Sequence, residues 1–228
     1  MTADNVENIR KRIAAACARV NRNPEEITLV AVAKTFPAER ISEAVGAGIA
    51  DIGENYVQEI REKREVLLDR PIRWHFVGHL QSNKVKYIAP WISCIHSVDS
   101  PGIGEEISRQ FERHGRRAAV LVEVNSTGEK SKFGVTPENA GELVARLSEF
   151  RGIDVRGLMT IGPFLPDPEA SRPAFRMLNE LRMKLSEGGA MLTECSMGMT
   201  NDFEVAIEEG ATLVRIGTAI FGKRTRRV

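Results

Sequence analysis

The sequence predicts a (β/α)8 TIM barrel that forms a single domain over residues 1–228, with one extra helix at its N-terminus. Short runs rich in β-branched residues alternate with longer amphipathic segments along the whole chain, and there are eight such runs. Parallel strands need crossover connections of a dozen or more residues, which the amphipathic segments supply. A chain of 228 residues is also close to the roughly 250 residues of a typical barrel.

The first segment predicts a helix that precedes the barrel. Val6, Ile9, Ile13, Cys17 and Val20 recur every three or four positions, a spacing that places them on one face of a helix. The pattern stops at the NRNP sequence that follows, where asparagine and proline favour a turn.

Eight segments have the composition of buried strands, because they are short, rich in valine, isoleucine and leucine, and bounded by turns or helical patterns. In chain order they cover residues 28–34, 50–55, 73–78, 94–99, 118–124, 155–160, 192–197 and 212–217. Helical patterns lie between them, for example at 37–48, 56–68 and 137–150. Residues 160–173 hold four of the ten prolines and predict a long loop after the sixth strand. A doubly wound open sheet is the alternative fold, and the number of strands favours the barrel.

The composition argues against several classes of protein. A formal net charge of +1 gives no basic surface for nucleic acid or an anionic membrane. No run approaches the roughly 20 apolar residues of a membrane span, and the first residues lack the apolar stretch of a signal peptide. The three cysteines are widely spaced, which favours reduced thiols over disulfides or a zinc site. We therefore expect a cytoplasmic protein without a metal site, and a monomer.

In TIM barrels the active site lies at the C-terminal ends of the strands. Polar residues stand at the ends of the predicted strands, and they are Lys34, Glu54, Asn55, His79, Asp99, Asn125, Thr160, Ser196 and the run Arg215–Thr218. Candidate site residues should come from this set.

Lys34 ends the apolar run TLVAVAK, where a charged group is costly. Val30, Val32 and Ala33 exclude water, which favours the neutral amine over the ammonium ion. A neutral amine attacks carbonyl carbon, so a Schiff base is feasible at Lys34. The alternative is a lysine whose ammonium group simply reaches into solvent.

The sequences CSMGMTND and RIGTAIFG follow predicted strands seven and eight. Barrel enzymes frequently bind phosphate with these two loops and with backbone N–H groups at a helix N-terminus. The hydroxyls of Ser196 and Thr218 and the backbone of Gly217 are suitable donors, with helices expected to begin near Thr200 and at Thr218. The alternative is that these loops use Gly, Ser and Thr only as turn and cap residues.

Arg215 lies two residues before Gly217, so its side chain shares a face with that position. A guanidinium group there needs an acceptor, either a carboxylate or a ligand atom. Ion pairs with Glu54, Glu123 or Glu194 are the alternative, and the residues leave both possibilities open. A ligand with an aldehyde, a phosphate and a basic ring atom satisfies all three sets of residues, and pyridoxal 5′-phosphate (PLP) is such a ligand.

Seven motifs, taken in order, resemble those of the pyridoxal-phosphate homeostasis family, the YggS/PROSC group. They are VAVAKTFP, GENYVQE, WHFVGHLQSNK, KFGV, RGLMTI, CSMGMTND and VRIGTAIFG. The resemblance covers almost the whole chain. It implies the type III fold of PLP proteins, which is similar to the barrel domain of alanine racemase.

The resemblance also implies roles for six cofactor-binding residues and no catalytic residue. Lys34 carries the internal aldimine, Ser196, Gly217 and Thr218 hold the phosphate, Arg215 lies beside the pyridine nitrogen, and Asn55 lies near the cofactor. Cys195 and Thr200 stand where the family often has Leu and Ser, which removes no group that the phosphate site requires.

The function implied by the resemblance is intracellular homeostasis of this vitamin B6 cofactor, by storage and delivery to PLP-dependent apo-enzymes, with little or no turnover. An arginine beside the ring nitrogen disfavours its protonation and weakens the cofactor as an electron sink. Alanine racemases add a catalytic tyrosine from a second domain. Of the two tyrosines here, Tyr56 is expected at a helix start and Tyr87 is expected to be buried. The alternatives are a PLP-dependent amino-acid racemase and a cofactor-free Schiff-base aldolase acting on a sugar phosphate.

Overall fold

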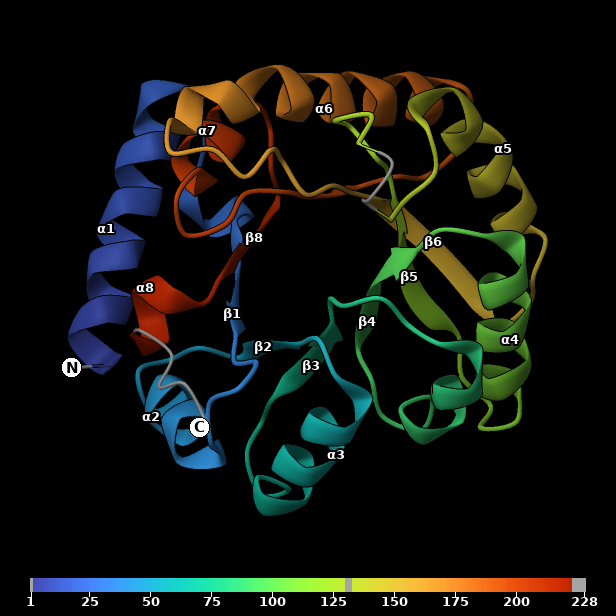
Figure 1. Cartoon of the computed structure of the whole chain (residues 1–228), viewed down its shortest axis with the longest axis horizontal. Coiled ribbons are helices and arrows are strands. Elements are labelled where there is room, and N and C mark those ends of the chain that lie inside the picture. Colours follow the sequence, from blue (N-terminus) through green and yellow to red (C-terminus); the bar gives the residue numbers. More distant parts are fainter. Residues whose placement is uncertain (1, 130–132, 223–228) are drawn as a thin grey trace.

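The computed structural model describes residues 2–129 and 133–222, whose strands form a closed parallel barrel of eight. Each strand pairs with its neighbours in chain order, and β8 returns to pair with β1. Figure 1 shows the strands around the centre of the molecule with the helices outside them. The predicted barrel is therefore confirmed, and the doubly wound open sheet is wrong.

Each of the eight strands overlaps its predicted segment, and most are shorter than predicted at one or both ends. They are β1 (Thr28–Val32), β2 (Asp51–Glu54), β3 (Arg73–Phe76), β4 (Cys94–Val98), β5 (Ala118–Glu123), β6 (Ile153–Met159), β7 (Glu194–Ser196) and β8 (Leu213–Ile216). β6 instead begins two residues earlier than predicted, because Ile153 and Asp154 pair with Ala118 and Ala119 of β5.

The helices include every helical segment predicted from the sequence. They are α1 (Thr2–Arg19), α2 (Ala38–Gly46), α3 (Val57–Val66), α4 (Pro101–Glu112), α5 (Pro137–Ser148), α6 (Arg172–Glu187), α7 (Phe203–Glu208) and α8 (Thr218–Phe221), with the 3-10 helices η1 (Pro24–Glu26), η2 (Ser82–Tyr87) and η3 (Pro168–Ser171). The crossover from β3 to β4 contains η2 in place of an α-helix. None of the helices in the described ranges has the length and apolar character that a membrane span requires.

The predicted N-terminal helix is confirmed as α1. Its buried face includes Val6, Ile9, Ile13 and Cys17, and it packs against α2, α7 and α8 (Figure 1). Because α7 and α8 are short, α1 covers the outside of the barrel beside them. This arrangement buries apolar surface that the last two crossover helices are too short to cover.

Helix α7 begins at Phe203, so the expected start near Thr200 is wrong. Residues 200–202 form a turn in which the Asp202 carboxylate accepts a hydrogen bond from the backbone N–H of Met199 at 2.7 Å. The same carboxylate accepts one from the Ser171 hydroxyl at 2.9 Å. The predicted long loop at 160–173 is confirmed, and its last residues belong to η3 and to the start of α6.

Apolar side chains occupy two separate regions. The main core lies between the strands and the helices, and a small second cluster of Cys94, Leu121 and Met159 lies on the opposite faces of β4, β5 and β6, inside the barrel. Barrel interiors are usually filled by branched apolar residues. Here much of the interior is instead filled by buried polar side chains, including two histidines and an arginine.

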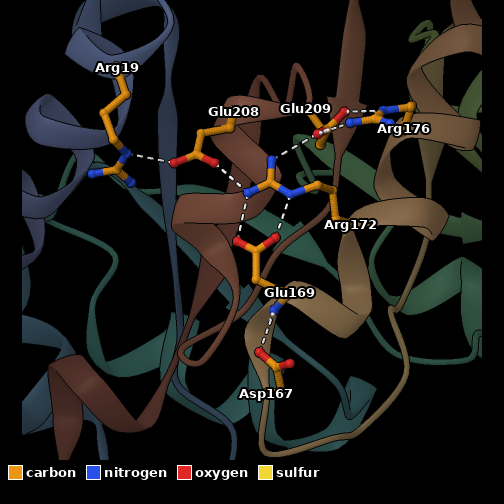
Figure 2. A network of polar contacts seen from close by, with 7 residues as sticks. All are labelled: Arg19, Asp167, Glu169, Arg172, Arg176, Glu208 and Glu209. Carbon is orange, nitrogen blue, oxygen red and sulfur yellow. Dashed lines mark hydrogen bonds and ion pairs between the residues drawn. The ribbon is translucent and has the colours of Figure 1, made fainter.

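A network of ion pairs links the N-terminal helix to the end of the barrel (Figure 2). Arg172, at the start of α6, contacts Glu169 at 2.6 Å, Glu208 at 2.6 Å and Glu209 at 2.8 Å. Glu208 also accepts from Arg19 of α1 at 2.6 Å. These contacts connect α1, η3, α6 and the end of α7.

Candidate functional site

Lys34 lies in a turn immediately after β1 and is half-buried. The pairing of β1 with β2 continues past the end of the strand, because the Ala33 N–H donates to the Gly53 carbonyl at 2.9 Å. The backbone at the base of Lys34 is therefore anchored to the barrel. Thr35 has a φ of +69°, a conformation that non-glycine residues rarely adopt and that is typical of functional sites.

The side chains of Glu54, Glu59 and Lys63 hold this turn from both sides. The Lys63 ammonium donates to the Ala33 carbonyl at 2.9 Å, to Glu59 at 2.8 Å and to Glu54. The Glu59 carboxylate in turn accepts from the Thr35 N–H at 2.8 Å. The two residues that flank Lys34 are thus fixed by one charged cluster.

Two members of the charged cluster, Glu54 and Lys63, are buried. The Glu54 carboxyl is fully buried, and burial raises its pKa against the opposing attraction of the Lys63 ammonium. Removal of Lys63 would leave the buried Glu54 carboxyl without its counter-charge.

Asn55 follows β2 beside this cluster. Its side-chain oxygen Oδ1 is buried and has no hydrogen-bond partner among residues 2–129 and 133–222. A buried amide oxygen of this kind costs free energy unless a donor satisfies it, so it is a natural contact for a ligand. The backbone of Asn55 lies so close to Gly78 that a Cβ there would stand 2.4 Å from the Asn55 carbonyl oxygen.

The loops after β7 and β8 bring hydroxyl groups to the same end of the barrel. Gly217 precedes α8 as its N-cap, and a Cβ at this position would stand 3.1 Å from the carbonyl oxygen of Val32, next to the Lys34 turn. Thr218 is exposed, and its hydroxyl donates to that of Thr200 at 3.3 Å. Gly198, in the loop between β7 and Thr200, has a φ of +86°, a backbone conformation that favours glycine.

Arg215 is buried, and no carboxylate of the described residues lies within ion-pair distance of it. The expected alternatives of ion pairs with Glu54, Glu123 or Glu194 are therefore wrong. Its guanidinium donates to the Ser196 hydroxyl at 2.5 Å and to the Thr160 carbonyl at 2.8 Å. Burial lowers the pKa of Arg215 to about 10, so the group is still charged at neutral pH.

Ser196 is fully buried, and its hydroxyl contacts both Arg215 and, at 3.0 Å, the imidazole of His96. The sequence predicted this hydroxyl as a phosphate ligand. Unlike Ser196, Thr200 is only half-buried and Thr218 is exposed, so the hydroxyls of these two threonines are accessible to a ligand. Thr200 was not among the predicted site residues.

These residues fit a ligand with the chemistry of PLP. Lys34 supplies an amine on a fixed turn, Arg215 a buried cation bonded to neutral acceptors, and Asn55 an unsatisfied amide oxygen. Because β8, β1 and β2 are neighbours in the barrel, these three residues belong to one sector of its C-terminal end.

The sequence did not indicate the supporting residues Glu59, Lys63 and His96, whose partners are distant in the chain or lie across the barrel. The expectation that Tyr87 is buried is also wrong. It is 38% exposed, and the charged groups of Arg61 and Lys86 lie over its ring at 4.7 and 5.0 Å. Tyr56 is 57% exposed and precedes α3, as expected.

A family model, curated relatives and solved structures all match nearly the whole chain. The family model described as "Alanine racemase, N-terminal domain" matches residues 5–225. The pyridoxal phosphate homeostasis protein of Aquifex aeolicus (strain VF5) is 46% identical over 222 residues, which are 97% of each chain. PipY of Synechococcus elongatus PCC7942, solved with PLP bound, is 32% identical with a TM-score of 0.85, and the match covers 97% of this chain and 100% of PipY.

A more distant structure shares the fold alone. The alanine racemase of Clostridium difficile 630 is 16% identical with a TM-score of 0.75, and the match covers 95% of this chain and 56% of the racemase. The near-complete match to the Aquifex aeolicus protein and the match to the family model, together with the barrel, show that this chain belongs to the pyridoxal phosphate homeostasis protein family.

Proposed function

We propose that the chain binds PLP at the C-terminal end of the barrel, with Lys34 as its covalent anchor. The observation that carries the proposal is the convergence of the Lys34 turn, the buried guanidinium of Arg215 and the unsatisfied oxygen of Asn55 on neighbouring strands. The bound PLP of PipY, a relative that matches 97% of this chain, supports the same ligand.

Each residue then has one task. Lys34 holds the cofactor, Arg215 faces the ring nitrogen, and Gly217 and Thr218 contact the phosphate. Because the hydroxyl of Ser196 already bonds Arg215, we assign Ser196 to the support of Arg215, and we add the Thr200 hydroxyl to the phosphate site.

The proposed role is PLP homeostasis, by storage and delivery with little or no turnover. PLP supplies a reactive aldehyde and an electron-withdrawing ring. A charged Arg215 beside the ring nitrogen keeps a proton off that nitrogen and so weakens the ring as an electron sink. We further propose one PLP-binding domain over residues 1–228 that acts as a cytoplasmic monomer and supplies PLP-dependent apo-enzymes.

An absorbance titration tests the binding site. PLP added to the wild-type protein should give a saturable visible band distinct from that of the free cofactor, and Lys34→Ala should abolish it. Lys84→Ala, a change at an exposed lysine outside the site, is the matched control and should leave the band unchanged. A band that persists in Lys34→Ala would reject the anchor.

Two further assays test the role. Loaded protein should reactivate a PLP-dependent apo-enzyme, and a yield no better than that of an equal amount of free PLP would count against delivery. Incubation with L-alanine in deuterated water should give negligible α-deuterium incorporation. Rapid, protein-dependent incorporation would instead indicate an amino-acid racemase.

A further inference from the structure

A continuous chain of hydrogen bonds crosses the interior of the barrel. Asp51 Oδ1 contacts His75 Nε2 at 2.9 Å, His75 Nδ1 contacts His96 Nε2 at 2.9 Å, and His96 Nδ1 contacts Ser196 Oγ at 3.0 Å. Arg215 Nη1 completes the chain at Ser196 Oγ, 2.5 Å away. Since β4 and β7 are not adjacent strands, the contact between His96 and Ser196 spans the interior.

The two ends of the chain fix the direction of every hydrogen bond in it. The Asp51 carboxylate can only accept, so a neutral His75 carries its single proton on Nε2 and accepts at Nδ1. His96 must then donate from Nε2 and accept at Nδ1. At the other end the guanidinium of Arg215 can only donate, which matches a Ser196 hydroxyl that gives its own proton to His96.

Burial preserves this direction by excluding water as a competing partner. His75, His96, Ser196 and Arg215 are each no more than 6% exposed. Burial lowers the pKa of His96 well below its usual value, and the charge of Arg215 lowers it further. A neutral His96 is the form that the chain requires, because a doubly protonated imidazole would donate to both neighbours.

The Asp51 end is itself anchored near the N-terminal end of the barrel. Asp51 begins β2, and Arg73, which begins β3, donates to both carboxylate oxygens at 2.7 and 2.5 Å. Asp51 thus stays ionised, since these contacts and the one from His75 keep its pKa low despite the opposing effect of burial.

We propose that Asp51, His75, His96 and Ser196 are positioning residues that orient the guanidinium of Arg215 toward the ligand. With its proton committed to His96, Ser196 presents a lone pair to Arg215, and the Thr160 carbonyl holds the other terminal nitrogen at 2.8 Å. The effect on PLP rests on the proposed function, whereas the direction of the chain does not.

A metal site is the competing interpretation of the same residues. One ligand atom each from His75, Cys94 and His96 lie within 4.8 Å of one another. However, all four imidazole nitrogens already have hydrogen-bond partners, and burial raises the pKa of the Cys94 thiol well above its usual value. A metal ion would have to break the chain and deprotonate that thiol, so the hydrogen-bond chain is favoured.

Nitrogen-15 NMR of the histidines in the PLP-free wild-type protein tests the chain without any variant. His75 and His96 should both show a protonated Nε2 and an unprotonated Nδ1 at neutral pH. A protonated Nδ1 at either residue would overturn the proposal. So would stoichiometric zinc that removes the protonated Nε2 signals of both.

Two variants test the effect on the ligand. His75→Phe removes the acceptor of His96, and Ser196→Ala removes the last link to Arg215. Each should shift the absorption maximum of bound PLP and weaken its binding about tenfold. His114→Phe, at an exposed histidine outside the chain, is the matched control and should do neither.

The outcomes separate the two claims. If both variants bind PLP with the wild-type affinity and spectrum, the positioning role is wrong. If the wild-type protein does not bind PLP, the proposed function fails, and the NMR result still decides whether the directional chain exists. A variant that does not fold is replaced by the other, because each interrupts a different link.

Discussion

Lys63 is the side chain that supports Lys34 most directly, because it contacts Ala33, Glu54 and Glu59 together. In Lys63→Met the buried Glu54 carboxylate would lose its counter-charge. We expect the free energy of unfolding to fall by about 3 kcal/mol in a urea titration, and attachment of PLP to slow.

The double variant Glu54→Gln/Lys63→Met is the control for this prediction. It removes the buried charge along with its partner, so most of the lost stability should return. The turn would still lack the Lys63 contact to Ala33, so attachment of PLP should stay slow. A single variant as stable as the wild type would contradict the account.

Glu123 makes stability depend on pH. Burial raises its pKa to about 7 from about 4.5, Asp99 adds to the effect, and Arg215 opposes it. Between these two values the folded state binds more protons than the unfolded state, so stability falls as pH rises through this window. Glu123→Gln should be more stable than the wild type at pH 8 by on the order of 2 kcal/mol.

Thermal unfolding at a series of pH values measures this difference. The advantage of Glu123→Gln should shrink as pH falls from about 7 and should vanish below about 4.5, where both states of the wild type are protonated. A constant difference across that range would show that Glu123 does not titrate as described.

The sequence singled out Lys34, Arg215, Gly217 and Thr218 as candidates because each stands at or just after the end of a recognisable strand. It could not reveal that the Ser196 hydroxyl points to Arg215 and His96, since the direction of a hydroxyl depends on partners 19 and 100 residues away. Lys63 was equally hidden, because a lysine on a helix ordinarily faces solvent.

At the scale of single elements, the loop after β7 depends on Gly198. A Cβ there would stand 2.5 Å from the Ala206 Cβ and 2.9 Å from the Phe203 Cα, at a φ of +86°. Gly198→Ala should therefore destabilise the protein by about 2 to 4 kcal/mol. It should also weaken PLP binding, because the Gly198 carbonyl accepts from the Arg215 N–H.

Gly102→Ala is the matched control for this change, measured by thermal unfolding and PLP titration. Gly102 lies in the first turn of α4, and a Cβ there meets no atom within 4 Å. Alanine favours helix over glycine by up to about 1 kcal/mol, so this variant should be as stable as the wild type or more so. Equal losses in both variants would refute the role of the β7 loop.

The strands and long helices could be predicted because their apolar residues recur with a clear period. The residues at which elements begin and end were harder to predict. The start of α7 was placed too early because Thr200 looks like a cap, while the turn is made by Asp202. Tyr87 was expected to be buried because a helical segment was expected to pack it against a strand. The 3-10 helix η2 instead leaves its ring under the charged groups of Arg61 and Lys86.

At the scale of the whole molecule, Arg172 links segments from both ends of the chain (Figure 2). Its three carboxylate partners hold its pKa above the usual value. Arg172→Met should lower the free energy of unfolding by about 1 to 2 kcal/mol, and by less in high salt. Denaturant titrations at two salt concentrations measure both effects.

Arg146→Met is the control for this network. Among the residues that the structure describes, Arg146 pairs with one carboxylate, that of Glu149, at an exposed position, so its loss should change stability by less than about 0.5 kcal/mol. If Arg172→Met were no more destabilising than Arg146→Met, the network would not contribute to the stability of the fold.

The overall fold followed from the number, length and alternation of the segments, which leave a closed parallel barrel as the simplest way to bury them. Closure also assembles the candidate site, since pairing of β8 with β1 brings Gly217 beside Val32 and the Lys34 turn. The polar chain through the interior could not be predicted, because it joins strands that are far apart in the sequence.

The central claim is that PLP attaches to Lys34 at this end of the barrel. The most direct measurement is borohydride reduction of the PLP-loaded protein, followed by digestion and mass spectrometry of the peptides. The account predicts one stoichiometric pyridoxyl label, on the peptide that contains Lys34. A label on another lysine, or spread over several, would contradict it.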